Sequence, residues 1–136
     1  MRLSCIRDYW LNDFNLNSAI PATQVFLDYV PPGIDMPYVR LTVINWTRED
    51  TTGGKDDTHI ENLQYQFSVF SLDLDALTTL METVILEFDN ADIDTGYTLR
   101  NRRTKRLMFG EVINGAYTYH GILEYELTSN SSDSHV

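Results

Sequence analysis

The stretch Leu63-Gln64-Tyr65-Gln66-Phe67-Ser68-Val69-Phe70 decides the fold, because it alternates apolar with polar residues and leads straight into a helical pattern. Alternation with a period of two is typical of a strand that buries one of its faces. After Ser71, apolar residues recur every three to four positions up to Phe88, which predicts an amphipathic helix. The stretch therefore predicts a β-strand that passes directly into a helix packed on the same sheet.

The predicted helix begins at a clear capping site. Ser71 or Asp73 supplies the N-cap, and Asp73 and Asp75 both suit the positive end of the helix dipole. At about 100° per residue, the apolar residues form one stripe. That stripe consists of Leu74, Leu77, Leu80, Met81, Val84, Ile85 and Phe88. The opposite side of the helix is polar except for Leu86, which lies at its centre.

Further strands are predicted on both sides of this unit. They are expected at residues 24–29, 37–46, 107–113 and 116–127. Asn114-Gly115, between the last two, is the dipeptide best suited to a type I′ hairpin turn. In the last strand large apolar and polar residues alternate, so one face is predicted to be buried and the other, which includes His120, to be solvated.

A short N-terminal helix is predicted before the first strand. Ser4 supplies its N-cap, and Ile6, Trp10 and Phe14 recur at intervals of four residues, which places them on one face. The chain thus combines several strands with one main and one short helix. This pattern predicts an α+β fold, in which the main amphipathic helix packs on a small antiparallel or mixed β-sheet.

Two polar segments are predicted to lie outside this packed structure. Residues 47–59 contain Gly53-Gly54 among Thr, Asp and Lys and have little to bury, so they are predicted to form a mobile loop. Residues 128–136 are rich in serine and are predicted to be a disordered polar tail. Residues 1–127 are therefore predicted to form one domain, which a length of 136 residues also favours.

The chain is strongly acidic, with 20 acidic and 10 basic residues and a formal net charge of −10. Five of the ten basic residues lie in the basic run, residues 100–106. Such an acidic surface repels nucleic acid over most of its area. The longest apolar run has only a few residues, so no membrane-spanning segment is expected, and the single Cys5 cannot form an internal disulfide.

No residue pattern points to catalysis or to a bound metal ion. Residues 89–96 resemble a calcium loop, but the EF-hand register places Thr95 where glycine is needed and Asn101 where a bidentate glutamate is needed. The histidines are isolated and have no cysteine partners, which argues against a zinc site. We therefore expect no catalytic residue, no cofactor and no metal.

The basic run is the main candidate for an interaction site. Alternation along a strand would place Arg100, Arg102 and Arg106 on one face, and Arg103 and Lys105 on the other. Three interpretations stay open: a solvated hairpin end, a contact with the acidic face of a neighbouring subunit, and a nucleic-acid contact. The last of these lacks the interleaved aromatic residues of a stacking platform.

The segments follow one another in a recognisable order. Val30-Pro31 and Met36-Pro37-Tyr38-Val39-Arg40-Leu41 are followed by a polar loop, by the strand at residues 63–71 and then by the helix. The order of these segments and their residues resemble the phage tail completion family, whose members are also called tail terminator or head–tail joining proteins. The likeness continues to the closing strand at residues 117–127. It implies a small α+β fold without enzymatic activity that assembles as rings, typically hexamers.

The resemblance also implies a location and partners. The ring would lie in the virion, at the head-proximal end of the tail, after assembly in the host cytoplasm. It would stop the polymerisation of the tail tube protein and would contact the head connector or head-closure protein. DNA would pass through the ring without specific binding. The expected subunit or partner contacts are Arg100, Arg102, Arg103, Lys105 and Arg106, together with Leu86, Arg48 and Lys55. Alternatives are another neck or tail tube component, a small cytosolic oligomeric binding module, and a small enzyme.

Overall fold

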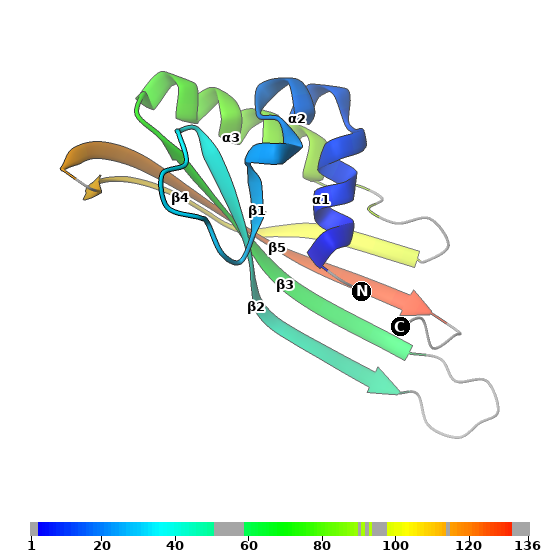
Figure 1. Ribbon diagram of the computed structural model, residues 1–136. Helices are drawn as coiled ribbons and strands as arrows, with labels where there is room; N and C mark the ends of the chain where they lie inside the picture. Colours follow the sequence, from blue (N-terminus) through cyan, green and yellow to red (C-terminus); the bar gives the residue numbers. More distant parts are fainter. Residues whose placement is uncertain are drawn as a thin grey trace.

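A mixed sheet with the strand order β1-β2-β3-β5-β4 forms the centre of the structure, which is a computed structural model (Figure 1). The strands are β1 (Val25–Leu27), β2 (Tyr38–Asp50), β3 (His59–Ser71), β4 (Thr98–Ile113) and β5 (Ala116–Ser131). β1 pairs with β2 in parallel, and the other neighbouring strands are antiparallel. The structure describes residues 3–50, 59–89, 91, 93, 98–113 and 115–131.

Helices lie on one face of this sheet (Figure 1). They are α1 (Leu3–Asn12), α2 (Phe14–Ala19) and α3 (Leu74–Phe88), and a short 3₁₀ helix, η1 (Ala22–Gln24), precedes β1. Together with the mixed sheet, they confirm the predicted α+β fold with one main helix and a short N-terminal helix. None of the described helices is long and apolar enough to cross a membrane.

β3, α3 and β4 form a crossover. Both β3 and β4 pair antiparallel with β5, which lies between them, so β3 and β4 run parallel to each other. A parallel connection needs a long crossover, and α3 supplies it over one face of the sheet. The start of α3 agrees with the sequence, since the side chain of Asp73 accepts a hydrogen bond from the backbone N–H of Ala76 at 3.1 Å.

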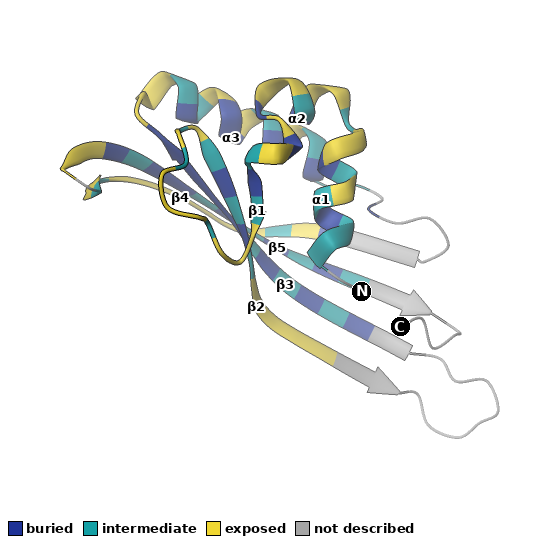
Figure 2. Cartoon of the chain, in the orientation of Figure 1, coloured by how far each residue is buried: buried dark blue, intermediate teal, exposed yellow. Residues whose placement is uncertain are grey.

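The helices divide the sheet into two unlike faces. We term the covered one the helix face; it carries Val39, Leu41, Leu63, Tyr65, Phe67, Val69, Leu123, Tyr125 and Leu127, all buried. We term the opposite one the open face; it carries Tyr38, Arg40, Thr42, Ser68, Phe70, Thr118, His120 and Ile122. Exposed residues gather on the outer sides of the helices and at the end of the β4–β5 hairpin (Figure 2).

The core lies between α3 and the helix face. Phe88 packs on Phe67 with ring centroids 4.8 Å apart, and the sulfur of Met81 occupies the space that a Cβ at position 121 would need. Gly121 therefore allows α3 to approach β5 closely. The buried residues of α3 are Leu77, Leu80, Met81, Val84 and Phe88, which confirms the predicted orientation. Leu74 is the exception within the predicted stripe, because it lies in the first turn and is 44% exposed.

A polar network fixes the C-terminal end of α3 to three strands. The hydroxyl of Tyr65 donates to Oδ1 of Asn101 at 2.7 Å, and Nδ2 of Asn101 donates to the carbonyl of Phe88. The hydroxyl of Tyr125 donates to the Asp89 carboxylate at 2.7 Å. Burial raises the pKa of both tyrosines, so both remain protonated donors. The network thus satisfies a helix-end carbonyl that has no partner within α3.

The N-terminal segment differs from the single helix that was predicted. The side chain of Asp13 caps α2, so the chain forms two helices that meet at this residue. Ile6 and Trp10 are buried as predicted, but Phe14 begins α2 and is 83% exposed. The interval of four residues continues across Asp13 in the sequence, whereas the helix does not. An Asp that accepts a backbone hydrogen bond starts a new helix.

The connection between β2 and β3 is shorter than the predicted loop at residues 47–59. β2 continues to Asp50 and β3 begins at His59, and the two strands pair over this length. Although these residues are polar, pairing stabilises them as strands, because the hydrogen bonds between β2 and β3 satisfy their backbone groups on the paired edge. Residues 51–58, including Lys55, lie outside the described residues, so the mobility of the loop stays a prediction.

β5 is also longer than predicted. It continues to Ser131, past the predicted end at Leu127, and pairs with β3 on one side and β4 on the other. A strand with neighbours on both sides satisfies its backbone even where its side chains are polar. Residues 132–136 lie outside the described residues.

Two leucines of α3 test the packing of the helix. Leu77→Ala should lower the free energy of unfolding by about 2–5 kcal/mol, because Leu77 is fully buried against the sheet. Leu86→Ala, the matched control on the exposed side of the same helix, should change it by less than about 0.5 kcal/mol. Urea unfolding followed by circular dichroism measures both values, and equal losses in the two variants would contradict the orientation of α3.

Candidate interaction surface

The basic run lies in β4, at one edge of the sheet. β4 begins at Thr98, well before the predicted start at residue 107, so the run is part of a strand and is distant from the hairpin turn. Each described cation of the run lies near a carboxylate of the same chain. The pairs are Arg102–Glu126 (3.6 Å), Arg103–Asp89 (3.7 Å), Lys105–Glu124 (3.5 Å) and Arg106–Glu82 (3.1 Å). Pairs with an exposed cation contribute about 0–1 kcal/mol, so Arg102, Lys105 and Arg106 are able to exchange partners.

A β-bulge distributes the run between the two faces. The register of β4 against β5 shifts between Arg103 and Lys105. Arg102 and Lys105 therefore lie on the open face, while Arg103 and Arg106 lie on the helix face next to the acids of α3. The prediction that Arg106 shares a face with Arg102, and Lys105 with Arg103, is wrong. Simple alternation fails wherever an extra residue is inserted in one strand.

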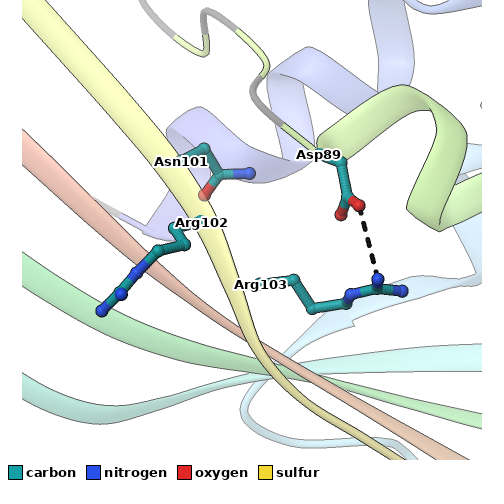
Figure 3. A pocket seen from close by; sticks show the side chains of 4 residues that line it. All are labelled: Asp89, Asn101, Arg102 and Arg103. Atoms are coloured by element: carbon teal, nitrogen blue, oxygen red, sulfur yellow. Dashed lines mark ion pairs between the residues drawn. The ribbon is translucent and has the colours of Figure 1, made fainter.

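A polar pocket of about 180 Å³ lies beside the run (Figure 3). Its lining residues are Asp89, Asn101, Arg102 and Arg103. Arg103 points toward Asp89 at the end of α3, whereas Arg102 points away from it (Figure 3). Asp89 already accepts the hydroxyl of Tyr125, and Asn101 already bonds the end of α3. The residues that line the pocket therefore have a structural role, which is to anchor the end of α3.

The other predicted contact residues are spread over the molecule. Leu86 is 77% exposed on the outward side of α3, as predicted. It lies one turn from Glu82, the partner of Arg106, so Leu86 and Arg106 share the same side of the subunit. Arg48 and Arg100 lie in β2 and β4, where the backbone alone is described, and Lys55 lies outside the described residues.

The open face carries an aromatic row that the sequence did not reveal. Ring centroids lie 4.9 Å apart for Tyr38 and Phe70, 4.1 Å for Phe70 and His120, and 4.8 Å for His120 and Phe109. Phe26 of β1 extends the row beyond Tyr38. The row crosses all five strands, because Tyr38, Phe70, His120 and Phe109 are in register and Phe26, opposite Arg40, meets Tyr38 diagonally. Knowledge of the strand register would have been needed to find it.

His120 is buried within this row, although its face was predicted to be solvated. It is 8% exposed, and Phe70 and Phe109 flank its ring. Burial lowers the pKa of His120, and the nearby charge of Arg40 lowers it too, against an opposing effect of Glu111. The Glu111 carboxylate lies 3.3 Å from Nδ1, close enough for an ion pair, yet neither ring nitrogen has an aligned hydrogen bond. The imidazole is therefore neutral at pH 7.

Within the described residues, no group of His, Cys, Asp and Glu side chains is arranged to hold a metal ion. The features that remain for recognition are the charges along β4, the exposed leucine on α3 and the open face.

The burial of His120 makes stability depend on pH. A histidine with a folded-state pKa below the unfolded value of about 6.5 favours the folded state above that pH and loses this contribution as the pH falls. The free energy of unfolding should therefore decrease from pH 7 to pH 5. His120→Phe keeps an aromatic ring in the row and should weaken this decrease. Chemical unfolding of both proteins at several pH values measures it, and identical slopes would show that His120 is not the group responsible.

Comparison with known proteins shows a likeness of fold. No protein-family model and no curated protein matches the chain. Among solved structures, a chain in the virion of a native gene transfer agent particle is similar, with a TM-score of 0.63 and 14% sequence identity. The likeness covers 94% of this chain and 93% of that chain. At this identity it shows that the two chains share a fold over nearly their whole length.

Proposed function

We propose that this chain is a structural protein of a phage-like virion, of the tail completion type. It forms a closed ring, a hexamer, at the head-proximal end of the tail, where it ends the tail tube and joins it to the head connector or head-closure protein. The observation that carries the proposal is the shared fold with a chain of a gene transfer agent virion over 94% of the length. The order of the sequence segments supports it independently, through their resemblance to tail completion proteins.

Unlike surfaces on one subunit support ring formation. The open face presents Arg102 and Lys105, whose ion pairs are exposed and weak. The outward side of α3 presents Asp75 and Glu82 beside the exposed Leu86. When two different surfaces of the same subunit are complementary, they make head-to-tail contacts, and such contacts close into a ring if the rotation permits.

The remaining predicted contacts belong to the same proposal. Arg103 and Arg106 face α3, and Arg48, Lys55 and Arg100 are proposed as further subunit contacts. The proposed ring is not an enzyme and needs no cofactor. A net charge of −10 also suits a channel through which DNA passes, because an acidic wall does not retain the polymer.

The mass of the assembly tests the proposal. Native mass spectrometry and negative-stain imaging of the full chain should give one closed oligomer whose size stays constant as concentration rises. Polymers that lengthen with concentration would instead favour a tail tube component, which needs an open-ended assembly. A protein that remains monomeric at every concentration would contradict the ring and favour a small binding module.

Charge reversal on the open face should prevent assembly. Arg102→Glu combined with Lys105→Glu should abolish the ring, because both substitutions turn complementary contacts into repulsion. These two positions are preferable to Arg103, whose pairing with Asp89 belongs to the anchoring of α3. Arg102→Gln with Lys105→Gln should weaken assembly to a smaller extent. Circular dichroism checks that each variant folds, and normal rings from the reversed variant would show that the cations are only solvated.

A further inference from the structure

In the described part of the chain, every buried side-chain nitrogen or oxygen without a hydrogen-bond partner lies on the open face. They are Nε of Arg40, Oγ1 of Thr42, and Nδ1 and Nε2 of His120. Buried polar groups in native proteins nearly always have a hydrogen-bond partner, so each exception calls for an explanation. The chain's own side chains shield these atoms, and all of them lie on the face without helices, which draws attention to the charged residue among them, Arg40.

Arg40 is the charged residue with an unsatisfied buried atom. Among the described lysine and arginine side chains, it is the one with neither an ion pair nor a hydrogen bond; Arg7 donates to two backbone carbonyls, and the four described cations of the basic run have acidic partners. The guanidinium carbon of Arg40 lies 6.0 Å from the ring centroid of Phe70. In a chain with ten more acidic than basic residues, a cation without a carboxylate indicates that one is supplied from outside.

The surroundings of Arg40 define the chemistry of the missing partner. Phe70 and His120 form an aromatic floor next to the guanidinium, and Leu107 and Phe109 continue it as exposed apolar side chains. A flat aromatic surface beside one cation fits a segment in which a carboxylate stands among apolar residues.

The chain itself contains such a segment, at the turn from β3 into α3. The acidic turn, residues 72–75, reads Leu72-Asp73-Leu74-Asp75. Leu72 is 59% exposed and Leu74 is 44% exposed, although both are large apolar residues. Asp73 is occupied as the N-cap of α3, whereas the exposed Asp75 side chain has no partner among the described residues. The acidic turn therefore offers a carboxylate with two apolar neighbours.

We infer that, in the assembly, the open face around Arg40 of one subunit binds the acidic turn of the next subunit. The carboxylate of Asp75 pairs with the guanidinium of Arg40, while Leu72 and Leu74 pack on the aromatic row. This inference rests on the proposed ring and names the two surfaces that meet in it.

A charge swap tests the pairing. Arg40→Glu and Asp75→Arg should each raise the protein concentration needed for half-maximal assembly by at least about tenfold, because each leaves a like-charged pair at the contact. The double variant, Arg40→Glu with Asp75→Arg, should restore assembly to within about threefold of the wild type. Asp8→Arg, which reverses an exposed carboxylate on α1, is the matched control and should assemble normally. Sedimentation velocity of the full chain over a concentration series measures all of these proteins.

The outcomes separate this inference from the proposed function. If the wild type forms rings and the single variants assemble equally well, the inference is wrong and the ring stands. Single variants that fail without rescue in the double variant would also overturn the Arg40–Asp75 pairing. A wild type that never assembles would remove both proposals. Should Arg40→Glu fail to fold, Asp75→Arg on the exposed first turn of α3 and the neutral Arg40→Gln still decide the result.

Discussion

The packing of α3 on β3 and β5 is the constraint on which the rest of the structure depends. β3 ends at Ser71 and α3 starts at Leu74, so the chain has too little length to leave the sheet and the helix must fold back over it. Burying a large apolar side chain stabilises the fold by about 1.5–3 kcal/mol, and α3 buries five of them. Gly121 permits this close approach, since any Cβ there would meet the sulfur of Met81.

This arrangement leaves the sheet with one covered face. The crossover through α3 carries the chain to β4, and the N-terminal helices fill the remaining area of the same side (Figure 1). The open face consequently has to satisfy its own side chains, and it does so only in part. Its rings stack on one another, while the polar atoms of Arg40, Thr42 and His120 find no partner. The unpaired cation and the exposed apolar side chains of this face are the physical basis for proposing an assembly.

Local features of the fold could be predicted from the sequence, and features set by strand pairing could not. The strand at residues 63–70, the cap at Asp73 and the exposure of Leu86 follow from residues close in sequence, and all three agree with the structure. The burial of His120 depends on which residues lie opposite it on β3 and β4. The faces of the basic run depend on a bulge, and neither register nor bulge has a signal within one strand.

The same limit applies to the candidate interaction surface. The basic run was identified by its composition, but its acidic partners come from α3 and β5, 14 to 24 residues away in the sequence. Once these pairs form, the run carries little uncompensated charge, and its exposed pairs are readily screened by salt.

Arg40 stands alone in the sequence and gives no compositional signal, yet it is the described cation left with neither a carboxylate nor a hydrogen-bond partner. A charge pair enclosed by apolar side chains contributes more to specificity than to affinity, because desolvation cancels much of its attraction. In the proposed contact, Leu72 and Leu74 on the aromatic row would therefore supply most of the affinity. Arg40 and Asp75 would fix the orientation in which one subunit meets the next, and a fixed orientation is what a closed ring requires of every contact.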